Sequence, residues 1–201
     1  MAAYKLTYFN ARGSAELIRL VFAQTGIAYE DQRLTSEEWA VMKPNTPFGT
    51  LPVLEVDGKQ ITGTLPIARY VAEAHNLAGS GLLENTLMAS TADAVQDLWI
   101  HIWQAKIEKN DTRRVELEAD LNEKHIPKLL CNLEKQACEG GWMFGSRLCW
   151  ADLHVFLLLD HLLVCQPRAL DNYPSLAKLT SNVERLPRIA EWLEKRPVTA
   201  L

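Results

Sequence analysis

The stretch "TLPVLEVDGKQITGTLPIARYVAEAH", residues 50–75, predicts a β-hairpin that runs directly into a helix. Apolar and β-branched residues flank Asp57-Gly58, a dipeptide that favours a tight turn between antiparallel strands. After the second strand, Thr64 suits an N-cap and Pro66 suits the first turn of a helix. Such a helix start also leaves backbone N–H groups that can hold an anion, although an ordinary cap explains this stretch equally well on its own.

The residues before the hairpin predict a β-α-β unit. Residues 4–9, "YKLTYF", are rich in strand formers, and residues 14–26, "SAELIRLVFAQTG", have apolar positions at helical spacing and end on a glycine. Residues 28–34, "AYEDQRL", are again typical of a strand. A looser stretch, residues 35–49, separates this unit from the hairpin. The first part of the chain therefore has the predicted order β-α-β-β-α.

From residue 82 onward the pattern is almost wholly helical. Apolar residues recur at helical spacing in residues 84–108, 113–137, 151–165, 175–187 and 189–197. The glycine-containing connector "NLAGSGLLEN" joins the two parts and is too short for a flexible linker. We predict an α/β domain over residues 1–76 and an all-helical domain over residues 82–201.

Composition excludes several classes of function. The 201 residues are 48% apolar and 23% charged, with a formal net charge of −4, so there is no basic field for a nucleic-acid backbone. No apolar run approaches the roughly 20 residues of a membrane-spanning helix, and the first residues lack the pattern of a signal peptide. We expect a cytoplasmic protein that binds neither nucleic acid nor membrane.

The cysteines and histidines indicate no metal site and no catalytic triad. The four cysteines include no CxxC pair and no spacing typical of zinc, so we expect buried free thiols. His154 and His161 lie on one apolar helical segment, where a histidine is more often a core or core-margin residue than a ligand. No histidine pairs with a serine or cysteine nucleophile in a recognisable order. We therefore predict that no metal is required.

Several motifs follow one another in a characteristic order. They are "YFNARG" from Tyr8, "EEWAVMK" from Glu37, "FGTLPVLEVDG" from Phe48, "TGTLPIARYVA" from Thr62, "WADLH" from Trp150 and the closing "KRPVTAL". Together they resemble the glutathione transferase family, and within it most closely the sigma class. The resemblance covers essentially the whole chain. It implies a thioredoxin-like α/β domain followed by the all-helical domain that forms the second-substrate pocket.

The resemblance implies an enzyme that activates the thiol of glutathione, its co-substrate. A free cysteine thiol has a pKa of about 8.5, so only a few per cent is thiolate at neutral pH. A hydroxyl that donates a hydrogen bond to the sulfur stabilises the thiolate more than the thiol. By resemblance Tyr8 is this catalytic donor. On its own it would read as a core aromatic residue at the end of a strand.

Further residues are expected to bind glutathione because of the resemblance. Pro52 is expected to follow a cis peptide bond, which lets Leu51 offer its backbone N–H and C=O to the cysteinyl part of glutathione; alternatively Pro52 only begins an edge strand. Trp39 and Lys43 lie four residues apart and share a helical face. The resemblance assigns them to the glycyl carboxylate, although such a pair is also common on ordinary surfaces.

The helix start at Gly63 and Thr64 is expected to bind the γ-glutamyl carboxylate. The family normally has Gln or Glu followed by Ser there; Thr64 keeps the hydroxyl, whereas Gly63 removes one side-chain contact. Asp97 is expected to reach across a homodimer interface toward the γ-glutamyl amine. Asp93 lies one turn before it. Acidic side chains at three places here in prostaglandin D synthases resemble a divalent-metal site between subunits, but Gln96 interrupts that set, so an exposed acidic helix face is the simpler interpretation.

The resemblance assigns Phe9, Arg12, Gly13 and Trp103 to the pocket for a small hydrophobic electrophile. Trp99 is expected to pack in the core instead. The apolar residues of such a pocket carry no readable code for the natural substrate.

The leading prediction is a dimeric, cytoplasmic transferase that conjugates the glutathione thiolate to electrophiles. A glutathione-dependent prostaglandin D isomerase is one alternative, weakened by Ser14, Gln96 and Gln104 at places where those enzymes have arginine, an acidic residue and tryptophan. A non-catalytic protein, either crystallin-like or a glutathione-binding module, is another. Gly63 slightly favours the non-catalytic alternative and Tyr8 opposes it.

Overall fold

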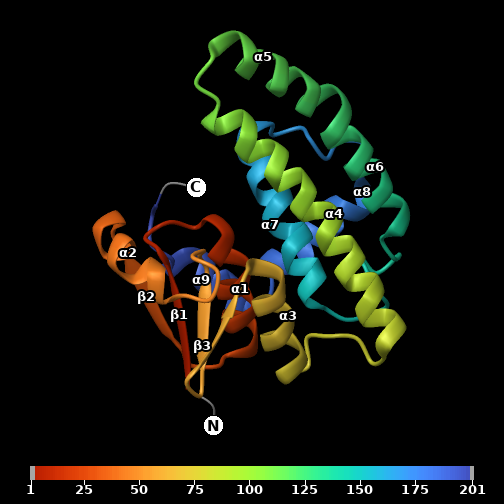
Figure 1. The fold of residues 1–201 in the computed structure, drawn as a ribbon. Coiled ribbons are helices and arrows are strands. Elements are labelled where there is room, and N and C mark those ends of the chain that lie inside the picture. The colour runs from red at the N-terminus through yellow and green to blue at the C-terminus, as the bar shows by residue number, and fades with distance from the viewer. Residues whose placement is uncertain (1–2, 200–201) are drawn as a thin grey trace. The chain divides into compact units, whose positions relative to one another are not determined.

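The computed structural model describes residues 3–199. The two residues at each end, which begin the stretch searched for a signal peptide and end the motif "KRPVTAL", lie outside the described residues. The chain divides into two compact units (Figure 1). The sheet unit comprises the residues up to Ala78 together with those from Glu184 onward, and the helical unit comprises Gly79–Val183.

Within the described residues, the sheet unit has a four-stranded sheet in the order β2-β1-β3-β4. Strand β1 pairs parallel with β2 and antiparallel with β3, and β3 pairs antiparallel with β4. The strands are β1 (Tyr4–Phe9), β2 (Glu30–Leu34), β3 (Val53–Val56) and β4 (Lys59–Thr62), and the helices are α1 (Glu16–Thr25), α2 (Ser36–Met42), α3 (Thr64–Ala74) and α9 (Pro187–Lys195). This confirms the predicted β-α-β-β-α order.

Positive backbone φ angles mark two of the predicted turns. Asp57 and Gly58 join β3 to β4 with φ of 48° and 77°, the left-handed pair that a two-residue type I′ hairpin requires. Gly26 ends α1 with φ of 69°, as a C-terminal glycine commonly does.

Helix α2 is more regular than the sequence predicted. Thr35 accepts the backbone N–H of Glu38, and the Glu38 carboxylate accepts the N–H of Thr35 at 2.7 Å. This reciprocal capping box stabilises a seven-residue helix inside a stretch rich in proline and polar residues. The Thr-x-x-Glu spacing is the signal that could have predicted it.

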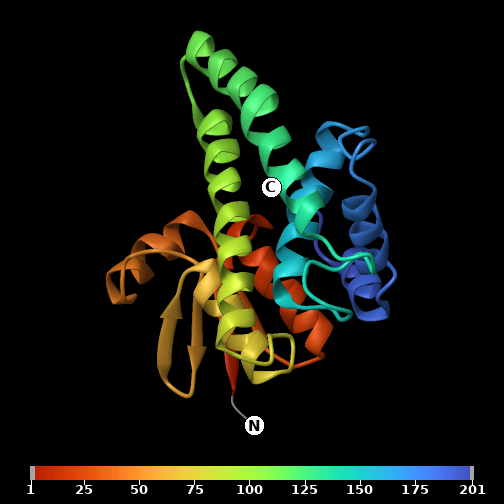
Figure 2. The ribbon, with the colours of Figure 1, turned by 90° about the vertical axis from the view of Figure 1, so that its right-hand side faces the viewer.

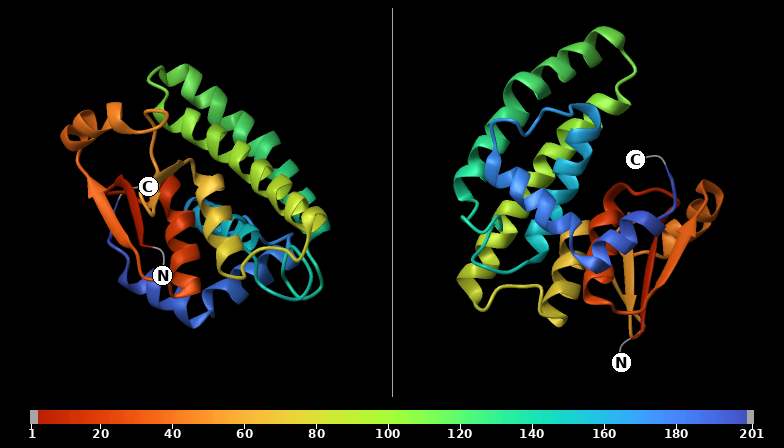
Figure 3. Two further views of the ribbon diagram at one scale, coloured as in Figure 1. Left: turned by 60° about the horizontal axis from the view of Figure 1, so that its bottom comes forward. Right: turned by 180° about the vertical axis from the view of Figure 1, so that it is seen from behind.

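The core of the sheet unit lies between the sheet and helices α1 and α3. These helices lie side by side along the sheet, and α9 packs against α1 (Figure 3). Fully buried residues from strands and helices meet there, among them Leu6, Ile18, Leu54, Ile67 and Val71. Burial of their apolar surface is the main force that holds the end of β1 beside the start of α3.

The helical unit contains a long helix of 26 residues, coloured from yellow to green in Figure 2. Its elements are α4 (Leu82–Ile107), α5 (Asp111–Asp120), a π-helical segment (Leu121–His125), α6 (Ile126–Gln136), α7 (Trp150–Cys165) and α8 (Pro174–Glu184). Helix α4 packs against both α7 and α5. Helix α7 is buried nearly all round, which explains its continuous apolar sequence.

The π-helical segment directly follows α5 and directly precedes α6, so the chain stays helical from one to the other. Pro127 follows it, and proline lacks the N–H that would bond to the carbonyl four residues earlier, that of Glu123. At the end of the segment the Ile126 N–H bonds to the carbonyl of Leu121, five residues earlier, which is the π-helical spacing.

Cys149 is the N-cap of helix α7. The Asp152 carboxylate accepts the backbone N–H groups of Cys149 and Met143, both at 2.7 Å. Burial raises the pKa of the Cys149 thiol, so the group stays uncharged. The prediction that all four cysteines are buried is wrong, because Cys131 in α6 and Cys165 at the end of α7 are exposed and Cys138 is half-buried.

Candidate active site

Tyr8 lies near the end of β1, where it pairs with Arg33 of the parallel strand β2. The phenol oxygen accepts a hydrogen bond of 3.1 Å from the backbone N–H of Ser14. Because the oxygen acts as acceptor in this bond, its own O–H is available to donate to an anion. A fixed hydroxyl donor at the edge of a sheet can stabilise a thiolate.

Gly13 lies directly against the phenol of Tyr8. A β-carbon on Gly13 would come within 2.6 Å of the Tyr8 hydroxyl oxygen, and the backbone φ at Gly13 is 41°. Both the space and the left-handed backbone therefore require glycine. The sequence assigned Gly13 to the second-substrate pocket, and its contact in the structure is with Tyr8.

Arg19 supports the turn that carries Gly13 and Ser14. Its guanidinium is fully buried and donates to the backbone carbonyl of Ala11 at 2.7 Å. Its central carbon lies 5.9 Å from the centre of the Tyr8 ring, within the range of a cation–π interaction. The buried charge thus fixes the start of the turn and lies close to the proposed catalytic ring.

Two carboxylates compensate the buried charge of Arg19. Glu16 lies 3.4 Å and Asp31 3.2 Å from its nitrogens. Glu16 also accepts from Trp192 at 3.0 Å and from Arg196 at 3.2 Å, so it joins α1 to the region of α9. This network was not predicted from the sequence. Its only signal is a Glu and an Arg three apart on a helical stretch that is otherwise apolar.

The start of α3 differs from the prediction in one respect. Gly63, with φ of 92° and ψ of 140°, is the N-cap, and Thr64 is the first helical residue. The prediction of Thr64 as N-cap is therefore wrong. The Thr64 hydroxyl donates to the backbone carbonyl of Ser14 at 2.9 Å. The helix start is thus bonded to the turn beside Tyr8.

The peptide bond between Leu51 and Pro52 is cis, as expected. The carbonyl of Pro52 accepts the N–H of Gly63 at 3.2 Å, which places the start of β3 against the N-cap of α3. Leu51 is half-buried just ahead of that strand.

Phe9 and Trp39 extend the site from Tyr8 toward α2. The ring centres of Tyr8 and Phe9 are 5.7 Å apart, and those of Phe9 and Trp39 are 6.3 Å apart, both edge-to-face. Lys43 is exposed in the 3-10 turn that follows α2, and its backbone N–H bonds to the carbonyl of Trp39. The sheet unit therefore brings most of the predicted residues into one connected region.

The remaining predicted residues belong to other surroundings. Asp97 is exposed on α4 of the helical unit. Trp103 is 53% exposed on the same helix, and the Lys106 ammonium lies 5.5 Å from its ring centre. Trp99 packs against His161 with ring centres 5.0 Å apart. Arg12 is half-buried beside Gly13 in the sheet unit.

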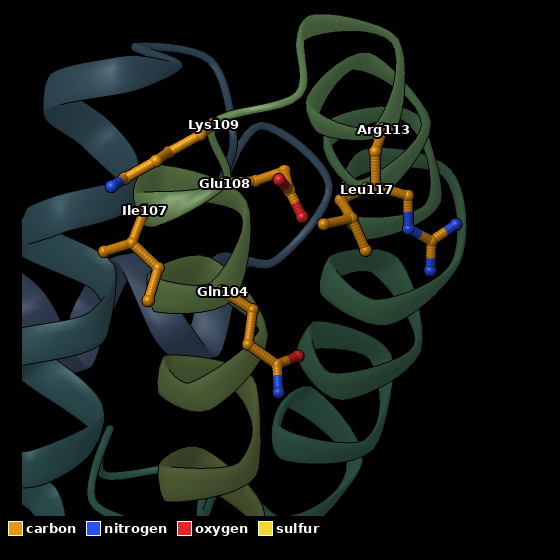
Figure 4. A pocket seen from close by; sticks show the side chains of 6 residues that line it. All are labelled: Gln104, Ile107, Glu108, Lys109, Arg113 and Leu117. Carbon is orange, nitrogen blue, oxygen red and sulfur yellow. The ribbon is translucent and has the colours of Figure 1, made fainter.

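The helical unit also contains a hollow between the end of α4 and α5 (Figure 4). Figure 4 shows Gln104 and Glu108 on one side and Leu117 on the other, facing the space between the helices. Lys109 and Arg113 add two more charged side chains to the lining. Its lining mixes these charged side chains with apolar Ile107 and Leu117, and it includes none of the residues predicted for the second-substrate pocket.

Among residues 3–199, no group of three or more His, Cys, Asp and Glu side chains is arranged to hold a metal ion. Nor is any helix in that range long and apolar enough to cross a membrane. His154 is buried in α7, where burial lowers its pKa to about 3 and keeps the ring neutral.

Comparison with known proteins identifies the family. The model of the glutathione S-transferase N-terminal domain matches residues 4–73, and that of the C-terminal domain matches residues 96–196. The hematopoietic prostaglandin D synthase of Gallus gallus is 40% identical over 202 residues, spanning 100% of both chains. Glutathione S-transferase 1 of Ascaris suum is 36% identical and spans 99% of both.

Solved structures agree with this. The monomeric Na-GST-3 of Necator americanus, a glutathione S-transferase, superposes with a TM-score of 0.90 at 33% identity, covering 99% of this chain and 100% of that one. The strand order around Tyr8, the cis bond before Pro52 and these matches lead to one conclusion: the chain belongs to the glutathione S-transferase family and is similar to its sigma class.

Proposed function

We propose that this glutathione S-transferase uses Tyr8 to stabilise the glutathione thiolate, which then attacks a small hydrophobic electrophile. The observation that carries the proposal is the position of the phenol, which accepts the Ser14 N–H at 3.1 Å and keeps its own proton for the sulfur. The reaction forms a carbon–sulfur bond on the electrophile while the leaving group departs with its electron pair.

Three regions of the sheet unit are proposed to hold glutathione. The backbone of Leu51, before the cis bond to Pro52, would pair with the cysteinyl part as an added strand does. At Gly63 and Thr64, the start of α3 with the positive end of its dipole would bind the γ-glutamyl carboxylate through the Thr64 N–H, because the Gly63 N–H already bonds to the carbonyl of Pro52. Lys43, with Trp39, would bind the glycyl carboxylate.

Phe9, Arg12, Gly13 and Trp103 are proposed to line the pocket for the electrophile. Phe9 offers an aromatic edge next to Tyr8, and Trp103 offers an exposed aromatic face in the helical unit. Soft, apolar electrophiles suit such a lining, since desolvation favours both their binding and the attack by a thiolate.

A homodimer is proposed from the character of α4. This helix buries one side in its own unit and still exposes large apolar residues, including Leu83, Leu87 and Ile100. In a dimer, Asp97 would reach the γ-glutamyl amine of the glutathione that is bound to the partner subunit. The Necator relative is described as monomeric, so membership of the family does not decide the oligomeric state. Light scattering tests the proposed homodimer and should give twice the mass of one chain.

If the site is shared between subunits, two inactive variants can complement each other. Asp97→Ala should weaken glutathione binding, and mixing it with Tyr8→Phe should restore part of the activity in the heterodimer. A monomer by light scattering, or no recovery on mixing, contradicts the shared site.

The cytoplasm is proposed as the location, because the described cysteines are free thiols of the kind that a reducing compartment maintains. No metal is proposed for catalysis.

Prostaglandin D isomerase activity is a second candidate, favoured by the 40% identity to the chicken prostaglandin D synthase. It requires glutathione at the same site. Direct assay of prostaglandin H2 conversion to D2 decides it, with Ser14→Arg as the variant expected to increase any activity present.

The first test of the main proposal is retention on immobilised glutathione, followed by conjugation of a chlorodinitrobenzene-type electrophile. Binding with turnover supports the proposal. Retention without turnover would leave the chain as a glutathione-binding protein, and would refute the role of Tyr8.

A further inference from the structure

We infer that Thr64 is a positioning residue for Tyr8, acting through the peptide backbone of Ser14, in addition to standing at the proposed glutathione-binding helix start. This inference rests on the proposed role of Tyr8 as donor to the thiolate. It goes further, because it assigns the Thr64 hydroxyl to the alignment of the catalytic phenol.

Two hydrogen bonds connect the three residues in series. The Thr64 hydroxyl donates to the Ser14 carbonyl at 2.9 Å, and the Ser14 N–H donates to the Tyr8 oxygen at 3.1 Å. Ser14 thus uses the backbone groups on its two sides to join residues that are 50 and 6 positions away in the sequence. A shift of the helix start would be transmitted to the phenol.

The turn that carries this connection has little freedom to deviate. Gly13 lies so close to the Tyr8 hydroxyl that a β-carbon there would be 2.6 Å away. Arg19 holds the turn at its beginning by its bond to the Ala11 carbonyl, 2.7 Å long. Thr64 holds it at its end. The phenol therefore rests on a short segment that is fixed from both sides.

The chemistry of a hydroxyl separates the two functions of the helix start. A threonine hydroxyl has one proton to donate, and in the structure that proton goes to Ser14. The proposed γ-glutamyl carboxylate would then be held by backbone N–H groups at the start of α3, which has no N–H at Pro66. The side chain of Thr64 would serve alignment and its backbone would serve binding.

Thr64→Val tests the connection, because valine keeps the shape of threonine and removes the hydroxyl. Thr64→Ser keeps the hydroxyl and is the conservative rescue. Thr86→Val is the matched control, since the Thr86 hydroxyl also donates to a backbone carbonyl, that of Leu82 at 2.7 Å, on a helix of the other unit.

The first measurement is the pKa of the bound glutathione thiol, determined from thiolate absorbance as the pH is varied. Glutathione is kept saturating, so that weaker binding does not affect the measured pKa. Thr64→Val should raise this pKa by about half a unit or more, which lowers the thiolate-to-thiol ratio about threefold or more near neutral pH. Thr64→Ser should restore the parent value, and Thr86→Val should not differ from it. An anchor that only binds the carboxylate would change affinity and leave this pKa unmoved.

The second measurement needs no glutathione. NMR measures the hydrogen-exchange rate of the Ser14 amide. This rate should rise about threefold or more in Thr64→Val and in Tyr8→Phe, and it should equal the parent rate in Thr64→Ser. Faster exchange together with a raised thiol pKa in Thr64→Val supports the inference. Unchanged Ser14 exchange overturns it whatever the thiol pKa does, and an unchanged thiol pKa overturns it as well. If Tyr8→Phe itself leaves the thiol pKa unchanged, the proposed function fails, a result distinct from either.

Discussion

At the scale of single residues, the site depends on backbone groups as much as on side chains. The phenol of Tyr8 accepts from the Ser14 N–H, and Pro52 accepts from the Gly63 N–H through its carbonyl. The residue type does not reveal which backbone N–H groups act as donors in a site. Tyr8 could therefore be named from its motif, whereas the part played by Ser14 could not, because any residue supplies the same N–H and C=O.

Gly13→Ala should lower turnover at least about tenfold, equivalent to about 1.4 kcal/mol, because the new methyl group displaces the Tyr8 hydroxyl, 2.6 Å away. Stopped-time conjugation assays measure the loss. Gly58→Ala is the matched control: Gly58 also has a positive φ, 77°, but a β-carbon there meets nothing within 4 Å. Both variants should lose stability; equal activity of the two would contradict the contact.

Gly63→Gln should destabilise the protein and not improve glutathione binding. From sequence alone, this change restores a contact that the family normally makes, but the φ of 92° at Gly63 strains any side chain. We expect Gly63→Gln and Gly63→Ala each to lose about 1 to 3 kcal/mol in urea melts. Tighter glutathione binding by Gly63→Gln alone, with unchanged stability, would show that the missing contact matters more than the backbone.

At the scale of elements, periodicity predicted the long helices and the hairpin because their apolar positions are regular. It missed α2, which is short and held by the Thr35–Glu38 capping box, and it missed the π-helical segment Leu121–His125 between α5 and α6. Neither feature changes the apolar period, so neither is visible in that pattern.

Cys149→Thr should stabilise the fold by about 0.5 to 2 kcal/mol, since a hydroxyl accepts the helix-start N–H better than a neutral sulfur. Asp152 already supplies the reciprocal half of the cap, with an oxygen 2.7 Å from the Cys149 nitrogen. Urea midpoints measure the gain. Cys165→Thr, at an exposed helix end, is the control and should have little effect. A lower midpoint for Cys149→Thr would mean that apolar packing of the sulfur outweighs the cap.

Buried His154 should make the protein less stable in acid. Burial lowers its pKa to about 3, whereas the unfolded chain has a histidine pKa near 6.5. Below about pH 6.5 the unfolded state binds a proton that the folded state does not, so stability falls as the pH falls toward 3. This one group should cost about 2 kcal/mol between pH 7 and 5. Urea melts of the parent and of His154→Leu give the difference in slope; identical pH dependence would contradict the assignment.

At the scale of the whole molecule, the sequence predicted two parts and their order, but it did not predict that the residues from Glu184 onward pack with the sheet unit. That packing depends on Glu16, whose carboxylate accepts from Trp192 and Arg196, 176 and 180 residues away. Contacts at such separation leave no local period. The motifs of the family predicted the fold, whereas the attachment of the last helix depends on these side-chain contacts.

The most direct test of the account is the pH dependence of conjugation at saturating glutathione, compared between the parent and Tyr8→Phe. The parent should show an apparent thiol pKa below the roughly 8.5 of a free thiol, and Tyr8→Phe should be at least about tenfold slower near neutral pH, with a raised thiol pKa. Tyr70→Phe, which removes a hydroxyl from a partly exposed tyrosine on α3, controls for the loss of a phenol oxygen. If Tyr8→Phe folds as the parent does and matches it in both rate and thiol pKa, Tyr8 does not stabilise the thiolate and the proposed mechanism is wrong.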